Sequence, residues 1–275
     1  MEDYQKQALL TAKELYPTAS ILELIEIAKT IEAQYYTDPN VPLSLIDFCQ
    51  STKIRHPIYG DKNFILYNFQ KCYMANLEKN KQIITISGRQ MGATNMLSKY
   101  ALWKAISNPY TTVQVLSNSF NSATEIRDNI QYTIQLAKSL RQKFLSTHKY
   151  NKSMISFPNG SEIKFGAITR NTTIDSDIII IDNTAFISHA IFDDFWIKNR
   201  SLISTNRQII MGGAAGITNG TFYNLYANPD KDWVTVEFPW NLHPERDQLW
   251  AADMISNMGQ EIFDREYGCK FTTAK

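Results

Sequence analysis

Ile83-Ile84-Thr85-Ile86-Ser87-Gly88-Arg89-Gln90-Met91-Gly92-Ala93-Thr94-Asn95 runs from a β-branched segment into a glycine-bearing loop and toward a helix. Phosphate-binding loops of the pattern G-x-x-x-x-G-K-[ST] have this shape, because their glycines let backbone N–H groups converge on phosphate oxygens at a helix N-terminus. Gly92 and Thr94 fit the pattern, whereas Ser87 replaces the first glycine and Ala93 replaces the lysine. The stretch predicts a phosphate-loop scaffold without its main positive charge.

The composition is that of a globular domain with a sizeable core. The chain has 275 residues, 44% of them hydrophobic, which places it at the upper end of one domain with room for a small subdomain. Its 28 Lys and Arg residues nearly balance its 27 Asp and Glu residues. Because the net charge is only +1, any contact with DNA would have to use a local patch.

The cysteines and the N-terminus bear on the compartment. Three cysteines, without a Cys-x-x-Cys pair, indicate neither a disulfide framework nor a zinc site. The first residues are acidic, unlike a signal peptide, and no apolar run approaches the roughly 18 residues of a membrane span. We expect a reducing, cytosolic environment.

Two regions are expected along the chain. Residues 1–60 are predicted to form a helical N-terminal arm, with two helices up to about residue 36 and then a proline-containing connection with a short helix around Leu45. Residues 61–275 are predicted to form the main domain, without a following nuclease domain. Helices are expected near residues 64–80, 96–106, 119–145 and 191–202, strands near 83–87, 112–116, 177–182, 207–211 and 233–238, a hairpin within 152–165, and two short helices before residue 275. This alternation predicts an α/β fold with a mainly parallel sheet flanked by helices.

The run Asp177-Ile178-Ile179-Ile180-Ile181-Asp182 predicts a strand buried on both faces. A phosphate loop serves an ATPase when such a strand ends in an aspartate for Mg²⁺ and a glutamate that activates water. Asp182 suits the first role, but Asn183 stands where the base is expected, and an amide cannot accept a proton from water. These motifs also occur singly in α/β domains that bind no nucleotide, so that alternative stays open.

Five collinear motifs between about residues 66 and 267 carry a resemblance to a known family. They are Phe69-Gln70-Lys71, the loop 87–92, Phe157-Pro158-Asn159-Gly160-Ser161-Glu162-Ile163, Asp182-Asn183-Thr184-Ala185-Phe186-Ile187, and Thr218-Asn219-Gly220 with Phe222-Tyr223. In this order they resemble the ATPase domain of the large terminase subunit of tailed phages, most closely the T4-like type.

The resemblance implies a P-loop NTPase-like fold that binds Mg–ATP. Gln70 would read adenine, while Thr94 and Asp182 would hold Mg²⁺. The remaining residues expected around the nucleotide phosphates are Ser87, Gly88, Arg89, Gln90, Gly92, Ala93 and Thr94.

The departures from the family pattern fall on its chemistry. Ala93 stands at the loop lysine, Asn183 at the catalytic glutamate, and Gly213-Ala214-Ala215 at the Thr/Ser-rich coupling motif. The segment before Asp177 keeps only Arg170 where the family usually carries Arg-Gly. Since phosphoryl transfer depends on positioning and charge stabilisation, these losses predict a pseudo-ATPase with weak or absent Mg–ATP binding.

Two alternatives compete with that interpretation. In the first, the chain is an active DNA-packaging ATPase in which Arg89 supplies the missing cation, since arginine binds phosphate bidentately, and Asn183 or an unidentified acid orients water. In the second, Ala93 and Asn183 were introduced to trap a working enzyme. The additional change at Gly213-Ala214-Ala215 argues against the second.

The resemblance also implies partners. Viral packaging or capsid proteins, such as the portal or other terminase subunits, would bind the chain. The resemblance places the chain in the host cytoplasm or with the virion. It allows an oligomer and implies no membrane association. DNA contact would use the densest basic stretch, although a solvated helix end explains the same residues equally well. That stretch comprises Lys138, Arg141, Lys143, His148, Lys149 and Lys152.

Overall fold

The computed structural model describes residues 13, 17, 19–26, 44–56, 60–136, 150–203 and 207–273. Most of the predicted N-terminal helices, the end of the predicted 119–145 helix and most of the basic stretch lie outside these residues. Among the helices that the structure does describe, none combines the length and apolar character needed to span a membrane.

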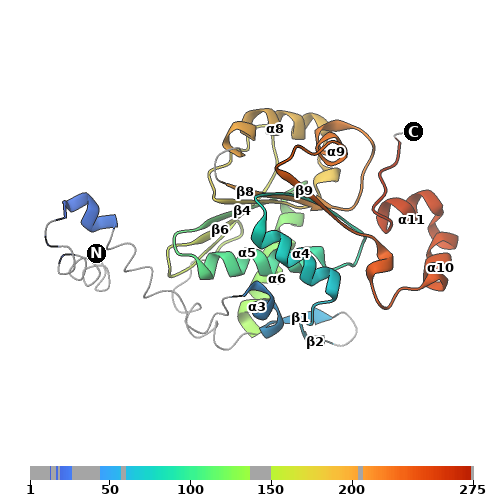
Figure 1. Ribbon diagram of the computed structural model, residues 1–275, viewed down its shortest axis with the longest axis horizontal. Coiled ribbons are helices and arrows are strands. Elements are labelled where there is room, and N and C mark those ends of the chain that lie inside the picture. Colours follow the sequence, from blue (N-terminus) through green and yellow to red (C-terminus); the bar gives the residue numbers. More distant parts are fainter. Residues whose placement is uncertain are drawn as a thin grey trace.

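A seven-stranded sheet forms the centre of the molecule (Figure 1). Its order is β5-β6-β4-β7-β8-β3-β9, and every neighbouring pair is parallel except the antiparallel β5–β6 hairpin. The mainly parallel α/β sheet predicted from the alternating pattern is therefore confirmed. Its strands are β3 (Gln82–Ser87), β4 (Thr112–Ser117), β5 (Met154–Ser156), β6 (Glu162–Ala167), β7 (Ile178–Ile181), β8 (Gln208–Gly213) and β9 (Trp233–Phe238).

The isoleucine run of β7 explains why the sheet has a core on each face. Successive side chains of a strand point to opposite faces. Ile178 and Ile180 accordingly join the core beneath one layer of helices, and Ile179 and Ile181 join the core beneath the other. All four residues of β7 are buried, as the sequence predicts for a strand covered on both sides.

Two helical layers cover the sheet. The first core contains residues of α3, α4, α5 and α6, and the second contains residues of α8 and α9, which lie on the opposite side of the sheet in Figure 1. The bounds are α3 (Leu45–Ser51), α4 (Asn68–Lys79), α5 (Ala93–Ser107), α6 (Phe120–Leu136), α8 (His189–Ile203) and α9 (Gly220–Ala227).

The C-terminal helices α10 (Gln248–Met258) and α11 (Gln260–Glu266) lie beside these layers (Figure 1). They have their own apolar cluster, in which Ala251, Phe263 and Tyr267 are buried. The segment from the end of β9 to Cys269 therefore forms a small appendage, which also contacts the predicted phosphate loop.

Two parts of the described fold were not predicted. In the hairpin of β1 (Lys53–His56) and β2 (Gly60–Asn63), β1 falls within the stretch predicted as a connection and β2 begins where that stretch ends. The helix α9 begins at the glycine of Asn219-Gly220, a residue pair typical of turns. The short helix predicted around Leu45 is α3, whose Leu45 and Phe48 are buried in the first core.

Candidate functional site

The predicted phosphate loop joins β3 to α5. β3 ends at Ser87 between β8 and β9, and α5 begins at Ala93. Gln90 (φ 61°) and Gly92 (φ 85°) take left-handed backbone conformations, which turn the chain from strand to helix. A β-carbon at Gly92 would lie 2.8 Å from Gln70 Nε2, so a larger residue there would have to displace the Gln70 amide as well as adopt a positive φ.

The loop has both occupied and available amides. Gly88 N donates to Phe238 O (2.9 Å) and Arg89 N donates to Glu266 O (2.8 Å). The first N–H groups of α5, on Ala93, Thr94 and Asn95, have no partner within the helix, because a helix leaves its first donors unpaired. These N–H groups are the donors that the scaffold offers to an anion.

Thr94 and Asp182 meet across the carboxyl ends of the strands. The side chain of Thr94 lies close enough to the carboxyl of Asp182 to lower its pKa, and Asp182 Oδ1 accepts a hydrogen bond from Asn183 N (2.9 Å). The pKa of Asp182 is raised from 3.8 to about 6, mainly by burial; the nearby charge of Glu125 acts in the same direction, and the hydrogen bond from Asn183 N opposes them. The structure thus brings together the hydroxyl and carboxyl that the sequence proposed as Mg²⁺ ligands.

The residue donors fit a magnesium–nucleotide complex only in part. Within the described ranges no cluster of three His, Cys, Asp or Glu side chains exists that could hold a metal. Mg²⁺ commonly uses one or two carboxylates together with substrate phosphates and water, and Thr94 with Asp182 suits that arrangement. Ala93 contributes no cation at the position of the loop lysine.

Asn183 occupies a backbone position that favours an amide side chain. Its φ of 55° lies in the left-handed region, which Asn tolerates better than most residues. Gly213 packs against it so closely that a β-carbon there would lie 3.0 Å from Asn183 Cα. The segment Gly213-Ala214-Ala215 therefore begins directly beside Asn183, which the sequence analysis predicts at the position of a catalytic glutamate.

The charge of Arg89, which was predicted to bind phosphate, is paired with a carboxylate of the protein itself. Its guanidinium forms an ion pair with the carboxylate of Glu266 at the end of α11. The Arg89 side chain is 59% exposed and that of Glu266 is 9% exposed. To bind phosphate with its full charge, Arg89 would have to leave this carboxylate.

Gln70 lies beside the loop with both ends of its amide engaged. Its Oε1 accepts from Tyr67 N (3.0 Å), and its Nε2 donates to Met91 O (3.0 Å). The side chain is buried and links the start of α4 to the phosphate loop. Adenine recognition by Gln70 stays a prediction, and it would require these bonds to be exchanged.

Arg246, which the sequence did not single out, also contacts the loop. Its Nη1 donates to Arg89 O (3.1 Å) and to Met91 Sδ (3.4 Å), and its Nη2 donates to Gln90 Oε1 (3.3 Å). The guanidinium carbon lies 4.6 Å from the ring centroid of Trp250. No local motif marks Arg246, because it approaches the loop from a segment more than 150 residues along the chain.

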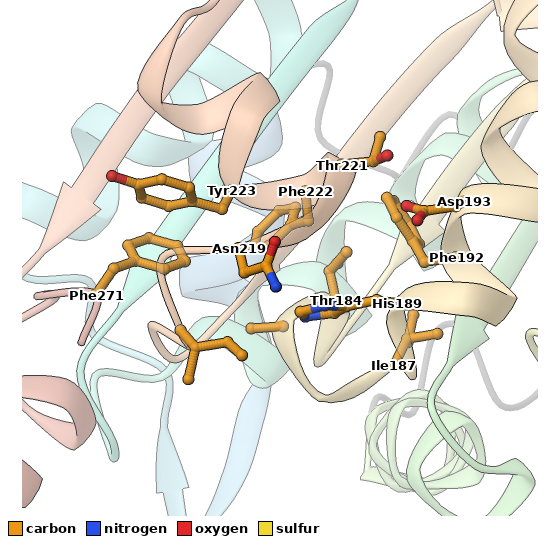
Figure 2. Close-up of a pocket in the computed structure, with 12 residues that line it drawn as sticks. Thr184, Ile187, His189, Phe192, Asp193, Asn219, Thr221, Phe222, Tyr223 and Phe271 are labelled. Carbon is orange, nitrogen blue, oxygen red and sulfur yellow. The ribbon is translucent and has the colours of Figure 1, made fainter. Parts of the chain in front are cut away.

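The motifs that follow β7 and β8 meet at a separate small pocket (Figure 2). Thr184 and His189 come from the first of these segments, Asn219 from the second, and Figure 2 shows the amide of Asn219 directed toward the other two. The pocket is otherwise largely aromatic, with Phe192, Phe222, Tyr223 and Phe271 in its wall. The motif after β7 and the motif after β8 are thus neighbours in space.

The basic stretch and Arg170, also singled out in the sequence, show fewer contacts that bear on function. In the basic stretch only Lys152 is described, and its backbone O accepts from Arg127 Nη1 (2.9 Å). Arg170 forms an exposed ion pair with Asp194 (3.3 Å). DNA contact by the basic stretch stays a prediction.

Comparison with family models identifies one match. The model described as "Terminase large subunit, T4likevirus-type, N-terminal" matches residues 84–223, just over half of the chain, from within β3 to within α9. No curated protein matches the chain.

Comparison with solved structures gives the same fold. The ATPase domain of the large terminase of Thermus phage P74-26 superposes with a TM-score of 0.61 at 14% identity, covering 76% of this chain and 95% of that one. The large terminase of bacteriophage HK97 gives a TM-score of 0.62 at 15% identity, covering 83% of this chain and 55% of that one. The large terminase of a thermophilic bacteriophage, solved in complex with ATP-gamma-S, gives 0.55 at 10% identity, covering 76% and 53%. The chain thus spans about half the length of the last two proteins.

Proposed function

The chain belongs to the T4likevirus-type family of terminase large subunits, and we propose that it is a degenerate ATPase-like domain of a phage DNA-packaging assembly. In this proposal it keeps the shape of the motor domain and weak affinity for Mg–nucleotide, but it hydrolyses ATP little or not at all. Its role is structural or regulatory within the assembly.

The observation that carries the proposal is the pairing of Arg89 with Glu266. Ala93 cannot supply the loop charge, and the neighbouring arginine that could replace it is bound to a carboxylate. A cation at the transferring phosphoryl group stabilises the charge of the transition state, and losing it reduces the rate by orders of magnitude. The amide of Asn183 can orient a water by hydrogen bonding but cannot take its proton.

The residues still present suit binding better than turnover. The first amides of α5 would donate to phosphate oxygens, and Thr94 with Asp182 would hold Mg²⁺, which would supply the positive charge at the phosphates when bound. Ionisation of Asp182 is needed for that contact. Because its pKa is about 6, the carboxyl is mostly ionised at neutral pH.

Steady-state hydrolysis with the 275-residue chain tests the proposal. We expect a rate at the background of a protein-free control, measured alongside calorimetric titration with Mg–ATP. Hydrolysis clearly above that background which disappears in Arg89→Ala would overturn the degenerate interpretation and establish the active alternative. Recovery of activity in the double variant Ala93→Lys with Asn183→Glu would support the degenerate interpretation, because it would show that only those two side chains were missing.

The same proposal extends to partners. We propose that portal or other terminase subunits bind this domain during packaging and that DNA contact uses the basic stretch containing Lys138, Arg141 and Lys152. Charge reversal of Arg141 and Lys143 together, followed by DNA gel-shift titration at increasing salt, tests the second part. Unchanged affinity and salt dependence would contradict it.

A further inference from the structure

We propose that Arg246 supplies the cation that the phosphate loop lacks, binding the phosphates of a nucleoside di- or triphosphate in place of the missing loop lysine. The inference deepens the proposed function, because it rests on weak nucleotide binding at the same loop. It assigns the charge to an arginine from the segment between β9 and α10, instead of to Arg89.

The first argument is placement. Arg246 donates to three successive residues of the loop, through Arg89 O (3.1 Å), Gln90 Oε1 (3.3 Å) and Met91 Sδ (3.4 Å). These three atoms lie directly before Gly92 and the first amides of α5. Arg246 is therefore a cation that the fold itself brings to the loop.

The second argument is charge. Arg89 is neutralised by Glu266, whereas no ion pair of Arg246 with a carboxylate occurs in the described part of the chain. The partners of Arg246 are a carbonyl, an amide and a thioether, all of them neutral. Its positive charge thus remains uncompensated beside the available amides of α5, where an anion gains most.

The third argument is preorganisation. The guanidinium lies over Trp250 (4.6 Å to the centroid) and beside Tyr267 (5.6 Å), and burial lowers the pKa of Arg246 below its ordinary value. A guanidinium so oriented loses little further rotamer entropy on binding. Its weak donation to Met91 Sδ can be exchanged for a phosphate oxygen, which is a far better acceptor.

Titration of Mg–ADP into the 275-residue chain and three variants tests the inference. We expect Arg246→Gln to weaken binding by about tenfold or more, as for loss of a charge-assisted hydrogen bond, and Arg246→Lys to recover part of the loss. Lys270→Gln is the matched control, because it removes one positive charge directly after the same appendage, and its ion-pair partner is Asp264 (3.1 Å), which is not part of the loop. Thermal melting of each variant establishes that it is folded.

Salt dependence separates a phosphate contact from a role in shaping the loop. If Arg246 touches phosphate, log Kd should vary less with log salt in Arg246→Gln than in the wild type, whereas a loop-shaping residue would shift Kd without changing that slope. Affinity in Arg246→Gln equal to or tighter than that of Lys270→Gln would overturn the inference. Absence of Mg–ADP binding to the wild type would overturn it too, together with the weak nucleotide affinity on which it rests, while leaving the proposed lack of hydrolysis intact.

Discussion

Glu266 binds Arg89 twice, through its carboxylate to the guanidinium and through its backbone carbonyl to the amide N–H at 2.8 Å. The end of α11 therefore fixes both the side chain and the main chain of one residue in the phosphate loop. Only the side-chain half of this arrangement can be removed by mutation.

Glu266→Gln should release the charge of Arg89 while retaining the shape of the side chain. We expect Mg–ADP affinity to rise a few-fold, because a second cation becomes available near the loop, and hydrolysis to stay at background, because Asn183 is unchanged. Calorimetric titration measures the first and a phosphate-release assay the second. Asp253→Asn on exposed α10 makes the same change in net charge and serves as control. Equal affinities in the two variants would contradict the prediction.

Asp182→Asn should stabilise the free protein at about pH 7.5 although it removes the proposed Mg²⁺ ligand. The folded pKa of Asp182 is about 6, above its ordinary value of 3.8, so the wild type loses stability from this group as pH rises from about 4 to 6 and does not regain it above. At about 1.36 kcal/mol per unit, the gain is on the order of 2 kcal/mol.

Urea unfolding of Asp182→Asn measures that gain, with Asp230→Asn as an exposed control. Mg²⁺ with ADP should raise the melting temperature of the wild type and not of Asp182→Asn. A less stable Asp182→Asn would show that the carboxylate is compensated in the free protein.

Lys99 should make stability depend on pH above neutrality. Burial lowers its pKa from 10.5 to about 7, and its Nζ donates to Lys53 O (2.9 Å) inside the first core. The unfolded chain then binds more protons than the folded one between about pH 7 and pH 10.5, so stability rises with pH in that window. We expect a rise of about 1–2 kcal/mol between about pH 7 and about pH 8.5.

Lys99→Met should flatten this rise whatever its absolute stability. Comparing the slopes of the wild type and the variant from urea unfolding at several pH values isolates the lysine, because other titrating groups are common to both. Parallel slopes would show that Lys99 titrates near its ordinary pKa.

Asn183→Glu alone should destabilise the protein by about 1 kcal/mol, because glutamate fits the left-handed region less well than asparagine does. Asn183→Gly, which places no β-carbon at φ 55°, should cost less and is the control. Chemical unfolding of both variants gives the order. If Asn183→Glu is the more stable of the two, the backbone must shift at this turn to accept a glutamate.

The sequence predicts the sheet well because its strong signals are local. β7 is recognisable from four isoleucines between two aspartates, and the loop before α5 from its glycine and threonine. β1 and β2 could not be found in this way, since the residues of β2 are exposed and show no alternation of polar and apolar side chains. α9 was missed because an Asn-Gly pair at its start has the residue signature of a turn.

The site could be predicted only where residues act through their own segment. Thr94 lies in the first turn of α5 and Asp182 directly follows β7, and both carry an oxygen that can bind Mg²⁺. Parallel strands bring the two residues to one edge of the sheet. Arg246 and Glu266 act through tertiary contacts with a loop far away in the chain, and no spacing in a single sequence encodes such a contact. The pairing that neutralises Arg89 was for that reason absent from the sequence-based expectation.

Gly88, at the start of the loop, is enclosed by the C-terminal appendage. Its amide donates to Phe238 O, and a β-carbon on it would lie 2.7 Å from Tyr267 O. Two residues before Gly88, Ile86 O accepts a hydrogen bond from Cys269 Sγ (3.3 Å). A displacement of the appendage as one body would therefore reach the phosphate loop directly through these contacts.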